Sequence, residues 1–184
     1  TVTPVDNAQI STAQSKFGGA SLLFDGSGDY LNIANNAGYQ FGTNDFTVEC
    51  WINTTDASFN LIGLNIVAIG NWAAVIFELG FYWQTTYSVT NLITNVPCSS
   101  ILNGNWHHIA IARSGSSLRL FFNGVVQGAS PYTDNTNYNG TGTLLVGTGA
   151  NGSLAGYIDD LRITKGVARY TANFTPPSAQ LPAR

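Results

Sequence analysis

Between residues 107 and 129, two short runs with an apolar residue at every second position are followed by a third short run that begins with two valines. They are separated only by residues 114–116 and by Asn123-Gly124. The Asn-Gly pair favours a type I′ turn, because both of its positions need a positive φ that these residues tolerate. A period of two places successive side chains on opposite faces of a strand, so we expect a three-stranded antiparallel meander here.

Short alternating runs recur along most of the chain, whereas helical periodicity is almost absent. Runs of this kind, separated by Gly, Asn and Ser, are typical of β-sandwiches and barrels. We therefore expect one all-β domain over residues 1–184, an antiparallel two-sheet β-sandwich. The expected strands cover residues 20–25, 30–33, 46–53, 66–69, 75–79, 87–90, 107–113, 117–123, 125–129, 143–147 and 156–164. Residues 26–29 are expected to join the first two of them as a tight hairpin.

The last strand departs from simple alternation. Ile158 and Leu161 are three positions apart, so they cannot share a face of a regular strand. A β-bulge at Asp159-Asp160 would let both point inward. The residues expected in the core are Leu22 or Leu23, Phe24, Val48, Ile52, Ile109, Ile111, Leu118, Leu120, Phe122, Val146, Ile158, Leu161 and Ile163.

Charge is sparse in this chain: 9% of the residues are charged and the net charge is −3. The seven basic residues are scattered from Lys16 to Arg184, which argues against nucleic acid as a partner. The longest apolar region, residues 61–83, is interrupted by polar residues and is not expected to span a membrane. Cys50 and Cys98 lack a metal-binding spacing, and either buried free thiols or a disulfide would fit them.

Four segments in order carry a family resemblance: residues 19–31, residues 44–52, residues 105–113 with 118–124, and residues 156–177. This set resembles laminin-G-like modules of the concanavalin A-like jelly-roll class. The resemblance implies a jelly roll that binds ligands at variable rims. Family members usually begin with a further strand, carrying a Phe-Asp-Gly-type motif, before the position that corresponds to Thr1 of this chain. The chain is therefore expected either to lack that strand or to be cut from a longer protein.

The ending from Ile163 to Pro177 also resembles segments of tailed-bacteriophage structural proteins and of bacterial surface proteins. This resemblance implies a virion, or an extracellular or cell-surface, location. The partners it implies are glycans or other virion subunits, and an oligomer would fit either setting.

Catalytic residues are not expected. Glycosidases of this fold class carry paired carboxylates on one strand, as nucleophile and general acid. Glu49 and Glu78 each stand alone on their strands, and the adjacent Asp159 and Asp160 would face opposite ways in a regular strand. The adjacent His107 and His108 likewise point to opposite faces and cannot chelate one metal ion.

Calcium is the cofactor that the resemblance implies, since proteins of this class often hold Ca²⁺ at a rim. The matching carboxylates are Asp25, Asp159 and Asp160, and oxygen ligands in Gly-rich turns suit this ion. The alternative is that Asp25 caps its turn and that Asp159 or Asp160 bonds backbone amides in the bulge.

Aromatic residues in the variable regions are the candidate ligand-binding residues. An aromatic face beside Asn and Asp groups is a common way to hold a sugar, and aromatic residues equally fill subunit interfaces or a second small core. Trp51 and Trp106, in contrast, are expected to pack between the sheets. The candidates are Trp72, Tyr82, Trp83, Tyr87, Tyr132 and Tyr138.

Together these features predict a non-catalytic recognition or assembly module. The first hypothesis is a glycan- or surface-binding domain of a phage tail fibre or adhesin. The alternative is a capsid decoration or cement protein that acts through protein–protein contacts.

Overall fold

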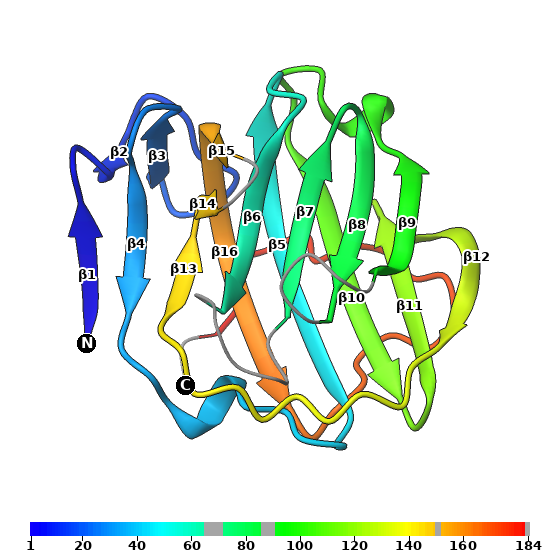
Figure 1. The fold of residues 1–184 in the computed structure, drawn as a ribbon. Helices are drawn as coiled ribbons and strands as arrows, with labels where there is room; N and C mark the ends of the chain where they lie inside the picture. Colours follow the sequence, from blue (N-terminus) through cyan, green and yellow to red (C-terminus); the bar gives the residue numbers. More distant parts are fainter. Residues whose placement is uncertain (65–71, 86–90, 150–151, 183–184) are drawn as a thin grey trace.

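Two antiparallel sheets of seven strands each face one another in the computed structural model, which describes residues 1–64, 72–85, 91–149 and 152–182 (Figure 1). This arrangement confirms the predicted all-β sandwich. The described residues contain no helix long and apolar enough to cross a membrane.

The first sheet has the order β1-β4-β13-β6-β7-β8-β9 and forms the front layer in Figure 1. All of its described pairings are antiparallel. Its strands are β1 (Val2–Val5), β4 (Tyr30–Ile33), β6 (Phe59–Leu64), β7 (Ala73–Phe77), β8 (Gly80–Gln84), β9 (Asn91–Pro97) and β13 (Leu144–Val146).

The second sheet has the order β12-β11-β10-β5-β16-β3-β2 and forms the back layer. A small β14–β15 ladder and two 3-10 turns complete the elements. The strands of this sheet are β2 (Gln9–Ser11), β3 (Ser21–Asp25), β5 (Phe46–Thr54), β10 (His107–Ser114), β11 (Ser117–Phe122), β12 (Val125–Thr133) and β16 (Ala155–Lys165). The smaller elements are η1 (Ala37–Tyr39), η2 (Ser99–Ile101), β14 (Thr148–Gly149) and β15 (Gly152–Ser153).

The predicted meander is confirmed as β10, β11 and β12, which pair in sequence. Asn123 and Gly124 between β11 and β12 have φ values of 50° and 78°. Both lie in the left-handed region that a type I′ turn requires.

The predicted bulge in β16 is also confirmed. The register between β16 and β5 shifts between Asp159 and Arg162, and Asp160 has a φ of 48°. Ile158 is buried in the core, and Leu161 packs against it. One extra residue thus returns the apolar side chains to the inner face.

The predicted hairpin at residues 26–29 is wrong, because β3 and β4 belong to different sheets. The chain crosses from one sheet to the other at Asp29, which is almost fully buried. Its carboxylate accepts the backbone N–H groups of Asn7 and Asp25 at 3.0 and 2.8 Å. These hydrogen bonds hold the chain in the crossover. The sequence suggested a hairpin because Gly26 and Gly28 are typical turn residues, but β3 and β4 place their apolar faces in different sheets.

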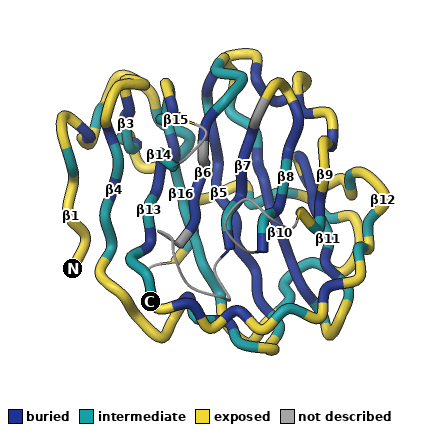
Figure 2. Tube along the Cα trace, in the orientation of Figure 1, coloured by how far each residue is buried: buried dark blue, intermediate teal, exposed yellow. Residues whose placement is uncertain are grey.

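The core lies between the sheets, where the facing strand positions are dark in Figure 2 and the outer strands β1 and β12 are largely exposed. The predicted core is confirmed at ten buried positions, with Leu22, Leu161 and Ile163 partly buried against it. Cys50 and Cys98 are buried free thiols. The ten buried positions are Phe24, Val48, Ile52, Ile109, Ile111, Leu118, Leu120, Phe122, Val146 and Ile158.

Strand prediction was weakest between residues 54 and 104. The strands expected at residues 66–69 and 87–90 lie outside the described residues. β6, β8 and β9 were missed, as were the short β1 and β2 near the start of the chain.

Candidate functional site

The outer face of the second sheet carries ordered rows of polar and aromatic side chains. Alternation in β5 turns Thr47, Glu49 and Trp51 to this face, whereas Val48 and Ile52 point into the core. Strand pairing places each of them beside a residue of β10 and a residue of β16. Glu49 is opposite Ala110 and Arg162, and Trp51 is opposite His108 and Asp159.

Glu49 is the centre of a buried polar cluster on this face. Its Oε1 accepts hydrogen bonds from Nε and Nη2 of Arg162 at 2.8 and 2.6 Å. Its Oε2 accepts a hydrogen bond from the Tyr170 hydroxyl at 2.7 Å and lies 3.2 Å from Nε2 of His108. Arg169 Nε lies 4.0 Å from Oε1.

The protein environment keeps Glu49 ionised. Burial alone would raise the pKa of this carboxyl, but hydrogen bonds from His108, Tyr170 and Arg162 hold it below the ordinary value. Burial, reinforced by the neighbouring Glu49, raises the pKa of the Tyr170 hydroxyl, which therefore stays a donor. Both carboxylate oxygens are occupied, so this glutamate acts as an anchor for the chain that covers it.

That covering chain is the segment that follows β16. It passes behind the second sheet in Figure 1. Tyr170 and Phe174 stack on each other with ring centroids 3.6 Å apart, and both pack against Phe121 of β11. The backbone N–H of Phe174 donates to the Gly124 carbonyl at 2.9 Å. A second, smaller apolar cluster thus closes this part of the outer face.

Three of the predicted ligand-binding aromatics lie in the core, which corrects the prediction that they face a ligand. Trp72, Trp83 and Tyr138 have exposed fractions of 1%, 0% and 0%. Trp83 stacks on Trp72 and donates its Nε1–H to the Tyr138 hydroxyl at 2.9 Å. Inward alternation in β8 buries Trp83 beside Phe81, so these rings fill the interior and offer no accessible face.

The other three predicted aromatics are dispersed. Tyr82 is half-buried on β8, and Tyr87 lies outside the described residues. Tyr132 is half-buried on β12, where its hydroxyl accepts the backbone N–H of Ala129 at 3.1 Å. Tyr82 and Tyr132 belong to different sheets and do not form one platform.

The predicted calcium ligands do not converge. Asp25 on β3 is paired with Ala155 on β16. Asp159 comes four residues after Ala155, which places it about 13 Å further along the strand. Asp25 accepts hydrogen bonds from Asn7 Nδ2 and the Ser27 backbone, which lower its pKa. Asp159 accepts the backbone N–H groups of Lys16 and Phe17 at 2.8 and 3.1 Å.

Asp160 accepts the backbone N–H of Leu181 at 2.9 Å. Burial, together with the neighbouring Asp159 charge, raises the pKa of Asp160 against the effect of that bond. Among the residues described, no group of three or more His, Cys, Asp or Glu side chains could hold a metal ion. The three aspartates therefore do not fit a shared calcium site, and the ion stays a prediction.

A half-exposed aromatic row, formed by Trp106 and Tyr157, lies at one end of the outer face beside the buried Trp51. Trp51 and Trp106 were expected between the sheets, but both lie outside them. Trp51 is covered by Phe17, whose ring meets it edge-on at 5.9 Å, and by Lys16, whose Nζ lies 4.0 Å from the indole centroid. Tyr157 of β16, opposite Asn53 of β5, approaches Trp106 with ring centroids 6.5 Å apart.

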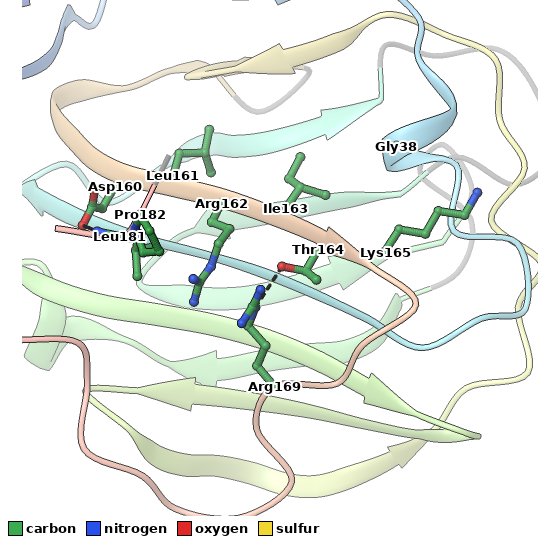
Figure 3. A pocket seen from close by; sticks show the side chains of 10 residues that line it. All are labelled: Gly38, Asp160, Leu161, Arg162, Ile163, Thr164, Lys165, Arg169, Leu181 and Pro182. Atoms are coloured by element: carbon green, nitrogen blue, oxygen red, sulfur yellow. Dashed lines mark hydrogen bonds between the residues drawn. The ribbon is translucent and has the colours of Figure 1, made fainter. Parts of the chain in front are cut away.

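A groove follows the second half of β16. It encloses about 560 Å³ and lies between this strand, η1 and residues 181–182. Arg162 and Arg169 approach it from one side of β16 and Lys165 from the other, near Gly38 (Figure 3). Arg169 is held in place by a 2.9 Å hydrogen bond from its Nε to the Thr164 hydroxyl.

Sequence reasoning missed both features. Arg162, Lys165 and Arg169 are close in the sequence but were treated as scattered charges. The signal was present in their number, because three of the chain's seven basic residues fall within eight positions. Nothing in the sequence around Tyr157 marks it as part of a site. Its partner Trp106 is remote in the sequence, and the two rings come together because β5 pairs with β10 on one side and with β16 on the other.

Comparisons with known proteins place the fold. A family model described as the concanavalin A-like lectin/glucanases superfamily, of the laminin G type, matches residues 25–169. No curated protein sequence gives a significant match.

Solved structures of similar fold include domains LG4-5 of the mouse laminin alpha1 chain, at 20% identity and a TM-score of 0.65, over 96% of this chain and 50% of that chain. The binding domain of botulinum neurotoxin serotype D aligns at 18% identity and a TM-score of 0.63, over 91% of this chain and 43% of that one. Domain 4 of AbnA, an extracellular arabinanase from Geobacillus stearothermophilus, was solved with arabinotriose. It aligns at 15% identity and a TM-score of 0.65, over 91% of this chain and 82% of that one. The chain thus spans half or less of the laminin and neurotoxin structures, and these likenesses show the fold alone.

Proposed function

The chain belongs to the laminin G-like family of the concanavalin A-like lectin/glucanases superfamily, and on this basis we propose that it is a non-catalytic recognition module that binds glycans. The fold is shared with domains that bind carbohydrates or proteins, and also with parts of enzymes such as sialidases. The choice among these activities has to come from the site.

The observation that carries the proposal is the aromatic row on the outer face. Trp106 and Tyr157 are half-exposed, and the half-exposed Asn53 lies opposite Tyr157 on β5. Such rings present an apolar face to a sugar, and the Asn amide supplies both a donor and an acceptor. The exposed Asn105 in the adjoining loop adds a further amide oxygen, and Asn103 holds Asn105 in place by accepting its backbone and side-chain N–H groups. A sugar ring stacked here would find hydroxyl partners on either side.

The carboxylate chemistry supports a binding role over hydrolysis. Glu49 is surrounded by donors and shielded from solvent, with a side chain that is 0% exposed. A glycosidase needs an accessible pair of carboxyl groups about 5–10 Å apart. The outer face offers Glu49 as a buried anchor and Asp159 as a backbone acceptor.

A glycan array with the purified chain tests the proposal. We expect binding that Trp106→Ala or Tyr157→Ala abolishes while the circular dichroism spectrum stays that of a β protein. Tyr82→Ala, which removes a half-buried tyrosine of the other sheet, is the matched control and should leave binding unchanged. Loss of binding in Tyr82→Ala alone would move the site to the first sheet and contradict the proposal.

A second candidate function is assembly, in a virion or at a cell surface. The exposed Val2 and Ile10 favour it, because they lie on β1 and β2, the edge strands of the two sheets at the same side of the sandwich (Figure 1). Exposed edge strands are available for pairing with another chain. A phage tail-fibre, adhesin or capsid-decoration role rests on the resemblance of residues 163–177. No array signal, combined with an oligomer whose size rises with concentration in sedimentation, would favour this candidate.

A further inference from the structure

The second half of β16 is a strand edge inside the sandwich. β16 pairs with β5 along almost its whole length, but with β3 only from Ala155 to Ile158. Beyond Ile158, no strand of the described part of the chain pairs with its other side. The groove of about 560 Å³ runs along this side.

Backbone groups of this edge point into the groove. The N–H of Gly166 donates to the Asp45 carbonyl at 2.7 Å, and Thr164 pairs with Thr47. In an antiparallel ladder, hydrogen-bonded pairs alternate with non-bonded pairs. The intervening Ile163 and Lys165 therefore direct their N–H and C=O groups away from β5, toward the groove.

Both ends of the edge are fixed by contacts. At one end, Lys165 Nζ donates to the Ala37 carbonyl of η1 at 3.1 Å. At the other end, Leu181 is bonded to Asp160. Residues 160–165 span about 20 Å at strand spacing, enough for an added strand of five or six residues.

The surroundings of the edge are positively charged. Lys165 is exposed, and the side chains of Arg162 and Arg169 are 20% and 22% exposed. The acidic groups nearby are engaged: Glu49 is buried beneath Arg162, and Asp160 accepts the Leu181 amide. A segment with carboxylates on both of its faces would meet Arg162 and Arg169 on one side of the edge and Lys165 on the other.

We propose that this groove binds an extended, acidic polypeptide segment of a partner protein, which adds to the second sheet as a strand beside β16. Strand addition uses backbone hydrogen bonds for affinity and alternate side chains for specificity, and the groove supplies both kinds of contact. An acidic polysaccharide would satisfy the cations but would leave the strand-edge amides of Ile163 and Lys165 without the regularly spaced partners of a peptide backbone.

Fluorescence anisotropy with a synthetic probe tests the proposal. The probe is a fluorescein-labelled octapeptide in which pairs of glutamates alternate with pairs of valines, so that carboxylates lie on both faces of the added strand. We expect saturable binding that weakens as salt is added, since partly exposed charges are screened. Lys165→Glu should weaken binding at least tenfold. Lys16→Glu makes the same charge change away from the groove and is the matched control, with binding expected to change by less than twofold.

The backbone contribution is separated by changing the probe, which leaves the protein fold untouched. The same octapeptide with N-methyl groups on alternate residues keeps every charge but loses the donors along one edge. We expect at least a tenfold loss for one of the two N-methylated registers, and slower amide exchange at Ile163 and Lys165 when the unmodified probe is bound. Trp106→Ala should not alter probe affinity, so this result is independent of glycan binding.

Three outcomes would overturn the inference. The first is no saturable binding of the probe. The second is equal binding of the unmodified probe and both N-methylated forms. The third is that alginate, an acidic polysaccharide, competes with the probe at equal charge and binds the Lys165→Glu variant more weakly than the wild type. That last result would assign the groove to acidic glycans.

Discussion

Replacing Glu49 by Gln tests the anchoring role of the buried cluster. The substitution keeps the shape of the side chain but removes its charge and turns one acceptor oxygen into a donor. If the amide nitrogen takes the place of Oε1, Arg162 loses its acceptor; if it takes the place of Oε2, Tyr170 and His108 lose theirs. Removing one member of a buried ion pair costs about 3–5 kcal/mol. Arg162 is 20% exposed and partly screened, so we expect about 3 kcal/mol, near the lower limit.

Urea unfolding followed by tryptophan fluorescence measures this loss. For a chain of this length, about 3 kcal/mol corresponds to a melting temperature lower by roughly 6–12 °C. Glu78→Gln is the matched control, because Glu78 is the chain's only other glutamate and is exposed. We expect it to change the unfolding free energy by less than about 0.5 kcal/mol.

The pH dependence gives a second readout with a defined sign. The pKa of Glu49 is lowered in the folded protein. Its ionisation therefore stabilises the fold fully above the unfolded pKa near about 4.3, and this contribution is lost as the pH falls through the folded pKa. The stability gap between the wild type and Glu49→Gln should be constant near neutrality and shrink on acidification below about pH 4. A gap that is absent at neutral pH, or equal at neutral and acid pH, would refute the anchoring role.

Three further predictions concern the interior and the metal. Burial raises the pKa of Cys50 to about 12 and of Cys98 to about 11. A thiol reagent at mildly alkaline pH should therefore label neither cysteine in the native protein and both after unfolding. Rapid labelling of the native protein would contradict their burial. Trp83→Ala should lower the unfolding free energy by about 3–5 kcal/mol, because it empties a fully buried site. Loss of ligand binding with unchanged stability would show instead that Trp83 contacts a ligand at the surface. A chelator should leave the melting temperature unchanged, since Asp25 and Asp159 are engaged apart from each other; a fall of several degrees would restore the predicted calcium ion.

Local pattern predicted the parts of the fold that local chemistry decides. The alternation in β10 and β11 and the Asn123-Gly124 turn specify a meander without distant partners. The three-residue step from Ile158 to Leu161 predicted the bulge, because both side chains had to reach one core. The turn at residues 26–29 was misread because glycines permit both a hairpin and a crossover. The buried Asp29 that decides between them is bonded to Asn7, a partner remote in the sequence.

The candidate site was much less predictable. An aromatic residue has the same local pattern on an inner or an outer face, and the pairing of sheets decides which face is covered. Trp83 is buried by the opposite sheet, whereas Trp106 remains half-exposed on the other side of the sandwich. The groove depends on where β3 stops pairing with β16, and the sequence of β16 alone carries no record of that point.

The position of β16 between β5 and β3, inside the second sheet, has a consequence for biosynthesis. Arg162 lies 113 positions after Glu49, its partner on the neighbouring strand. A ribosome that adds about 5–20 residues per second needs roughly 6–23 seconds to make that stretch. Until then one side of β5 has no neighbour, and the nascent sheet is an open template for association with other chains. Such long-range pairing is slow to form, so we expect completion of this sheet to follow synthesis of β16 and to be the stage at which a chaperone protects the chain.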